Sequence, residues 1–151
     1  AIERAWGILE KMGGKLWEID LPKYIKYVDD VKFPKFGWAT STDWRTNFRN
    51  HFPDIPQADF DDMEVHHAIP RHIQNKYPGL GIPDGQIHSV ENLRGISKKA
   101  LTVGGDKIHV EIGRMWNDFY IANPNATLDD LKQHALLIDN LYGSFFNPPV
   151  R

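Results

Sequence analysis

Apolar residues recur every three or four positions in the last third of the chain, a spacing that predicts two amphipathic helices. The first runs over 108–122 and stops before a proline. The second begins after Thr127, which forms a capping-box pair with Asp130, and ends at Gly143. The apolar positions on the two predicted faces are Ile112, Trp116 and Phe119 in the first helix, and Leu128, Leu131, Ala135, Ile138 and Tyr142 in the second.

The middle of the chain has the composition of extended segments. Residues 63–69 form a strand-like run that Pro70 stops, and residues 87–96 form a second extended piece. The other segments predicted here are a short helix over 71–77, a turn region over 78–85 and a loop rich in Lys and Gly over 97–106.

The N-terminal part has short elements and changes character near residue 62. The pattern predicts helices over 2–12, over 22–29 and, capped by residues 41–43, through Asn50, with a strand over 15–19 and a loop over 51–62. We therefore expect an α+β fold in a mostly helical single domain, in which 1–62 is an N-terminal helical and loop section and 63–151 is the core. A chain of 151 residues buries roughly two-thirds of its unfolded surface, enough for one core.

Composition limits which groups can bind a metal and whether the chain can span a membrane. Cysteine is absent, so a metal would be held by imidazole, carboxylate, amide or phosphate groups. No apolar run approaches the roughly 20 residues of a membrane span, and no signal-peptide pattern opens the chain, so no membrane partner is expected. The chain begins at Ala1 without Met, which we interpret as an excised fragment or processed domain.

The net charge of −2 argues against a generally basic nucleic-acid binder, but charge is distributed unevenly. The stretch from 92 to 107 carries four cations against the single acid Asp106. Those cations are Arg94, Lys98, Lys99 and Lys107. A basic stretch of this kind suits a phosphate backbone, and a solvated loop is the plainer interpretation.

Two adjacent histidines, His66 and His67, stand in the first strand-like run. Side chains alternate along a strand, so the two imidazoles face opposite ways. One could hold a metal while its neighbour faces a water or a phosphate, a division that phosphodiester hydrolysis needs. Asn92 follows on the next extended piece, and His109 opens a predicted helix.

This order of strand, strand and helix with His-His, Asn and His resembles the HNH (ββα-metal) endonucleases. The run Glu-Val-His-His-x-x-Pro is similar to the Glu-Leu-His-His-x-x-Pro of nuclease colicins. The stretches VHHAIP, IHSVENLRGI and WNDFY resemble the C-terminal nuclease domains of bacterial polymorphic toxins, namely the Rhs, contact-dependent and type VI secretion effectors. The resemblance covers residues 63–143 and implies a ββα-metal core, while residues 1–62 match no family we can name.

The resemblance implies a role for each motif residue. His66 and His109 would be metal ligands, and His67 would be the general base that takes a proton from the attacking water. Asn92 would pin the loop through backbone hydrogen bonds and orient the base. Glu64 would orient an imidazole or pair with an arginine.

One position departs from the colicin pattern. The further histidine expected four residues after His109 is Gly113. Asn117 lies roughly 12 Å along the helix from His109, too far to share an ion directly. A third ligand would have to come from His88 or Glu91, or from water and substrate.

The implied cofactor is one divalent metal ion. Two imidazoles favour zinc, nickel or manganese, and a water-rich shell leaves magnesium open. The ion would stabilise the charge on the phosphate and the departing oxygen, with Arg94 or Lys98 holding a neighbouring phosphate.

The leading hypothesis is thus a metal-dependent DNA endonuclease, the toxic C-terminal domain of a secreted bacterial effector that acts in the cytoplasm of a target cell. Its expected partners are DNA, a cognate immunity protein and a larger N-terminal delivery protein. Two alternatives stay open: a non-catalytic module that binds nucleic acid or a partner, and a metal-independent RNase toxin.

Overall fold

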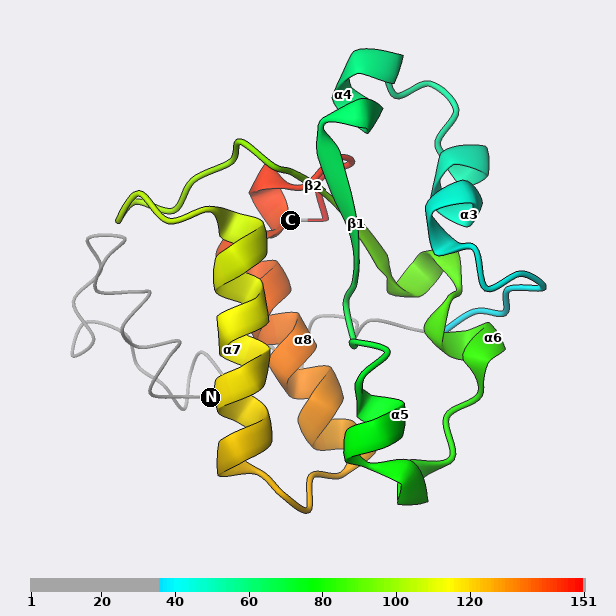
Figure 1. Cartoon of the computed structure of the whole chain (residues 1–151), viewed down its shortest axis with the longest axis vertical. Helices are drawn as coiled ribbons and strands as arrows, with labels where there is room; N and C mark the ends of the chain where they lie inside the picture. Colours follow the sequence, from blue (N-terminus) through cyan, green and yellow to red (C-terminus); the bar gives the residue numbers. More distant parts are fainter. Residues whose placement is uncertain (1–35, 151) are drawn as a thin grey trace.

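The computed structural model describes residues 36–150 (Figure 1). The helices predicted over 2–12 and 22–29 and the strand predicted over 15–19 lie outside the described residues. In the described part, the chain forms an α+β domain with six α-helices and one two-stranded antiparallel sheet. The elements are α3 (Trp44–His51), α4 (Gln57–Asp61), β1 (Met63–His67), α5 (Ile73–Lys76), η2 (Pro78–Leu80), α6 (Asp84–Ile87), η3 (Val90–Asn92), β2 (Leu93–Ser97), α7 (Ile108–Ala122), α8 (Leu128–Tyr142) and η4 (Gly143–Phe145).

The sheet joins β1 to β2, with His66 opposite Arg94 and His67 opposite Leu93. The extended piece predicted over 87–96 is wrong for residues 87–92, which are helical or turn-like. Ile87 is fully buried there against other elements, and short apolar runs do not distinguish strand from helix.

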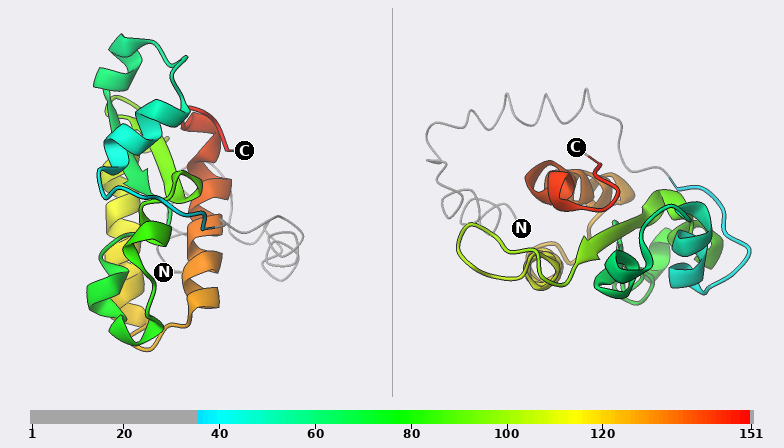
Figure 2. Two further views of the ribbon diagram at one scale, coloured as in Figure 1. Left: turned by 90° about the vertical axis from the view of Figure 1, so that its right-hand side faces the viewer. Right: turned by 90° about the horizontal axis from the view of Figure 1, so that it is seen from above.

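Each face of the sheet packs against a different set of elements, because side chains alternate along both strands. Met63 and Val65 face a small cluster that contains Phe48 of α3 and Phe60 of α4. On the other face, Ile96 packs into the larger core around α7 and α8. Figure 2 shows the sheet between these two groups of helices.

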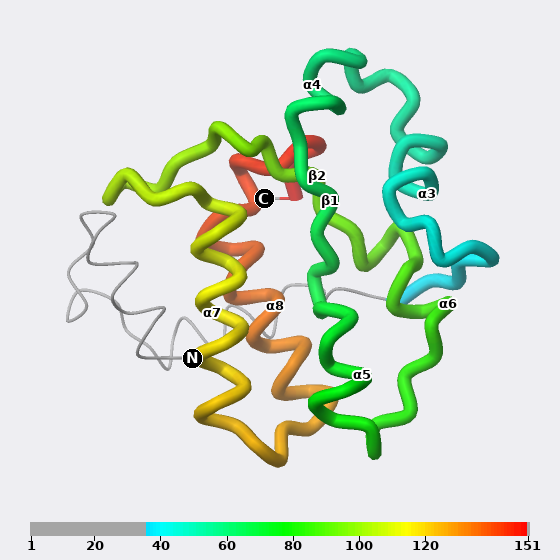
Figure 3. Tube along the Cα trace, in the orientation of Figure 1, coloured from blue at the N-terminus to red at the C-terminus, as the bar shows by residue number. Residues whose placement is uncertain are grey.

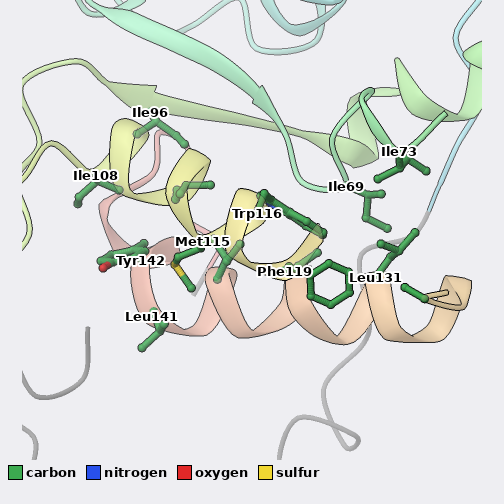
Figure 4. Close-up of a cluster of buried hydrophobic side chains, with 14 of the residues drawn as sticks. Ile69, Ile73, Ile96, Ile108, Met115, Trp116, Phe119, Leu131, Leu141 and Tyr142 are labelled. Atoms are coloured by element: carbon green, nitrogen blue, oxygen red, sulfur yellow. The ribbon is translucent and has the colours of Figure 1, made fainter. Parts of the chain in front are cut away.

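The larger core confirms the predicted helix faces except at Leu128, which is half-buried and lies outside this core. Trp116 and Phe119 of α7 lie against α8 with Leu131, Leu141 and Tyr142 (Figure 4), and Ile112 belongs to the same buried cluster. The capping box at Thr127 and Asp130 is formed, with the Thr127 hydroxyl accepting from the Asp130 N–H and the Asp130 carboxylate accepting from the Thr127 N–H. Each large apolar side chain buried here contributes about 1.5–3 kcal/mol.

The first described helix, α3, begins as predicted after Asp43, whose carboxylate accepts from the Thr46 N–H. The loop predicted over 51–62 is wrong for residues 57–61, which form α4. Phe60 of α4 is buried beneath the guanidinium groups of Arg45 and Arg49, at 4.2 and 4.9 Å. This tertiary contact stabilises a five-residue helix that has no periodic signal of its own.

The C-terminal tail returns to the sheet after α8, a path that Figure 3 traces. Phe146 bridges to Ile96, and the Asn147 N–H donates to the Gly95 carbonyl at 2.8 Å. A side chain at Gly95 would collide with the Asn147 carbonyl and with Phe48, so this crossing requires glycine. No helix in the described part is both long and apolar enough to span a membrane.

Candidate functional site

His66, near the end of β1, faces His109 in the first turn of α7. Their ring centroids are 6.0 Å apart and their planes are inclined by 80°. Two imidazoles bound to one ion at about 2.0–2.1 Å have centroids at most roughly 6.4 Å apart, so this spacing fits a shared ion. Burial, together with the smaller effect of the neighbouring His109, lowers the pKa of His66 to about 4. His66 is therefore neutral at pH 7, with a lone pair available for a metal.

Glu64 lies two residues before His66 on the same face of β1, and its charge opposes the lowering of the His66 pKa. The carboxylate is thus an electrostatic neighbour of the histidine pair. Among residues 36–150, however, no three His, Cys, Asp or Glu side chains come close enough to form a metal cluster.

The suggested third ligands lie elsewhere. His88 contacts His67, on the opposite side of β1 from His66, and the Glu91 carboxylate packs against Gly37. At Gly113 an added side chain would meet open space. Within residues 36–150, the ligands placed for a shared ion are therefore two imidazoles, those of His66 on β1 and His109 on α7.

His67 has its own partners on the α3 side of the sheet. Its Nε2 lies 3.0 Å from Nδ1 of His88, and Trp44 of α3 contacts both rings. Burial, together with the smaller effects of the nearby His88 and Arg71, lowers the pKa of His67 to about 3. The His67 imidazole is consequently neutral near pH 7, the form that can accept a proton.

The two histidines are nevertheless neighbours in electrostatic terms, because the charge of His66 contributes to the low pKa of His67. They flank the end of β1 from its two faces. A phosphate at the end of the strand could therefore meet an ion on one side and a base on the other.

Asn92 is fully buried and joins two segments by its side chain. Its Oδ1 accepts from the Ile69 N–H at 2.9 Å, and its Nδ2 donates to the carbonyls of Ile69 and Ile87 at 3.0 and 2.9 Å. Its backbone carbonyl accepts from the Ala68 N–H at 2.7 Å. Asn92 thus holds the segment that follows His67 against the residue that precedes His88.

The two predicted phosphate-binding residues lie in different environments. Arg94 forms a two-pronged ion pair with Asp139 of α8, at 3.1 Å from Nε and 3.0 Å from Nη2, and its side chain is only 11% exposed. The Arg94 guanidinium is therefore paired with a carboxylate inside the protein, and its side chain is largely shielded from solvent. Lys98 follows β2 and has an exposed side chain, but it lies beside Asp62 at the start of β1, at the opposite end of the strand from His66 and His67.

Two residues that sequence reasoning did not place at the site, Trp44 and Arg71, lie beside His67, together with His88, which was suggested only as a metal ligand. The Arg71 guanidinium is 5.0 Å from the Trp44 ring centroid, and His88 stacks on Trp44 at 5.3 Å with planes 8° apart. Arg71 is exposed, so its charge is accessible next to the histidine. No local pattern marks Trp44 or His88 as a neighbour of His67, because their proximity depends on the packing of α3 and of the segment before η3.

We compared the chain with protein-family models, with curated proteins and with solved structures, and none of the three comparisons gives a match.

Proposed function

We propose that this protein is a metal-dependent endonuclease of the HNH (ββα-metal) type that hydrolyses phosphodiester bonds of DNA. The observation that carries the proposal is the arrangement around the end of β1. His66 and His109 face each other at a separation that one ion can bridge, while His67 points to the other face as a neutral imidazole. Resemblance of the motif to HNH nucleases supports the same chemistry.

His66 and His109 would hold one divalent cation, with water and substrate oxygens completing its shell. A donor set of two neutral imidazoles and water accepts zinc, nickel or manganese, and magnesium when the water share is large. When bound, such an ion supplies charge stabilisation to the phosphate and to the departing oxygen.

His67 would take the proton of the attacking water. A pKa near 3 keeps its base form fully populated at pH 7, but makes the free imidazole a weak base. An anionic phosphate beside the ring favours the imidazolium and raises this pKa when substrate binds. Proton transfer thus becomes easier in the complex than in the free protein.

Exposed cations would hold the nucleic-acid backbone at both ends of β1. Arg71 lies near His67 at the end of β1, whereas Lys98, after β2, lies at the start of β1, where its N–H donates to the Asp62 carbonyl. Because phosphate contacts release counterions, we expect affinity for DNA to fall steeply with salt.

The biological role in this proposal rests on resemblance to the toxin nucleases. The domain would be the toxic C-terminal part of a secreted bacterial effector, joined to a larger N-terminal delivery protein and acting in the cytoplasm of a target cell. A cognate immunity protein would protect the producer.

The biochemical test is a cleavage assay on plasmid DNA and on RNA, with each divalent ion and with excess EDTA. The chain should nick DNA only with metal. His67→Ala should lower the rate by roughly 10²–10⁴-fold with the fold and metal affinity retained. His51→Ala, at an exposed histidine of α3, is the matched control and should retain activity.

Other outcomes of this assay identify the alternatives. Cleavage of RNA in EDTA would indicate a metal-independent RNase, and DNA binding without cleavage under any ion would indicate a non-catalytic module. For the toxin role, induced expression in a bacterial cytoplasm should arrest growth and degrade DNA, whereas expression of His67→Ala should do neither.

A further inference from the structure

A hydrogen-bonded pair of histidines lies on the α3 side of the sheet, apart from the His66–His109 pair. Nε2 of His67 and Nδ1 of His88 are 3.0 Å apart, so one nitrogen donates a proton and the other accepts it. The rings meet at 65° with centroids 5.1 Å apart. His88 is only 6% exposed, so it is held inside the protein and not on a mobile surface.

Three contacts fix the geometry of this pair. Trp44 stacks flat on His88 and meets His67 edge to face, at 4.9 Å between centroids. The Asn92 side chain ties Ile69, two residues after His67, to Ile87, directly before His88. The His88 carbonyl also accepts from Nδ2 of Asn47 on α3, at 3.4 Å.

The direction of the hydrogen bond decides what His67 can do. A neutral imidazole carries one proton and one lone pair, so a bond between two ring nitrogens needs the proton of one ring and the lone pair of the other. If His88 donated, the only lone pair of His67 would be occupied. If His67 donates from Nε2, its Nδ1 keeps a lone pair. That Nδ1 bonds to nothing in the described chain and is not among its buried unpaired atoms, so water can reach it.

We propose that His88 is a positioning residue for His67: its Nδ1 accepts the Nε2–H of His67 and thereby presents the Nδ1 lone pair of His67 to the attacking water. The chemical role rests on the proposed nuclease function. A base held in one tautomer by a third group is the arrangement that activates nucleophiles in many hydrolases. As His67 becomes an imidazolium, the bond to His88 strengthens because its donor gains charge.

The atoms of the step balance without a further reactant. The water oxygen bonds to phosphorus and its proton goes to Nδ1 of His67. The bond from phosphorus to the leaving oxygen breaks, and that oxygen keeps the electron pair and takes a proton from solvent. His67 then releases its proton to solvent, while the proton on Nε2 stays on the bond to His88 throughout.

The test combines a tautomer measurement with two variants. Long-range ¹H–¹⁵N correlation spectra, recorded in EDTA so that no ion bridges the rings, should show His67 of the intact chain with its proton on Nε2. His88→Phe keeps a ring against Trp44 without an acceptor, and should give a mixture of His67 tautomers. His88→Asn keeps an acceptor oxygen close to the position of Nδ1, and should restore the Nε2–H form.

Kinetics supply the second readout. His88→Phe should lower kcat by roughly 10–100-fold with little change in KM, and His88→Asn should recover most of that loss. Melting curves of both variants show whether each is folded. Because the tautomer of the unmodified chain is measured directly, the proposal can be tested even if a variant fails to fold.

The outcomes separate this inference from the proposed function. A proton on Nδ1 of His67 in the unmodified chain, or unchanged kcat in a folded His88→Phe variant, overturns the inference even if DNA is cleaved. A chain that shows the Nε2–H tautomer but cleaves nothing overturns the proposed nuclease and supports the geometry of the pair.

Discussion

Gly113 lies on the exposed side of α7, one helical turn after His109, and a side chain built there meets open space. Residues four apart on a helix share a face, and two histidines at that spacing can bind one ion. The geometry therefore predicts that Gly113→His adds a ligand beside His66 and His109. We expect the Kd for Zn²⁺ to fall by roughly tenfold or more, measured by isothermal titration.

The matched control for this prediction is Gly113→Ala. Replacing glycine in an exposed helix interior stabilises the fold by about 0.5–1 kcal/mol without adding a ligand. A fall in Kd that is equally large in Gly113→Ala would show that helix stability, and not a third imidazole, causes the change.

His134 of α8 is a core histidine, with its ring 4.6 Å from each of Trp116 and Phe119 and only 4% of its surface exposed. Burial lowers its pKa to about 3, against the 6.5 of an exposed histidine. Between pH 6.5 and pH 3, this histidine binds a proton in the unfolded chain but not in the folded chain. The free energy of unfolding therefore falls as pH decreases from 6.5 toward 3.

This histidine predicts a pH dependence that a substitution removes. Between pH 6 and pH 4, the free energy of unfolding should fall by up to about 1.4 kcal/mol per pH unit through His134 alone. His134→Leu should make the pH dependence shallower by that slope in urea titrations. Equal slopes in the two proteins would contradict the buried neutral state.

At the scale of elements, the ion pair between Arg94 and Asp139 connects β2 to α8. Both side chains are largely buried, at 11% and 7% exposure, and the Arg94 guanidinium also donates to the carbonyls of Glu91 and Leu93. Removing one partner leaves the other charge buried and uncompensated. Arg94→Met should therefore lower the free energy of unfolding by about 3–5 kcal/mol.

The double variant Arg94→Met with Asp139→Leu distinguishes a structural role of Arg94 from a role in binding substrate. Removing both charges costs far less than removing one, so the double variant should regain most of the lost stability in denaturant unfolding. If Arg94 only supports the fold, the folded double variant also keeps the salt dependence of DNA binding. A weaker salt dependence would assign Arg94 to the phosphate backbone after all.

At the scale of the whole molecule, an ion between His66 and His109 would connect the sheet to the largest helix pair. Ligands that bind only the folded state stabilise it, by about 2.7 kcal/mol at a concentration 100 times Kd. Zn²⁺ should therefore raise Tm in thermal melts, and EDTA should reverse the effect. His109→Ala should abolish the shift, while His51→Ala, which changes an exposed histidine outside the pair, should retain it.

Elements that depend on contacts between residues close in the sequence are predicted well, and elements that depend on contacts with distant residues are not. The boundaries of α7 and the capping box of α8 follow from periodicity and local hydrogen bonds, so sequence alone predicts them. The strand carrying His66 and His67 is likewise indicated by local composition. Residues 87–92 and α4 were predicted wrongly, since their conformation follows from burial against distant elements.

By itself, the sequence determined the two long helices, the strand with the histidine pair and the opposite directions of their imidazoles, because these follow from the repeat of the backbone. Only the tertiary structure decided which groups each imidazole meets. In the folded chain, His66 lies against His109 and His67 contacts His88 and Trp44. Arg94 forms an ion pair with Asp139. Contacts between residues 20 or more positions apart depend on how elements pack, and no local spacing encodes them.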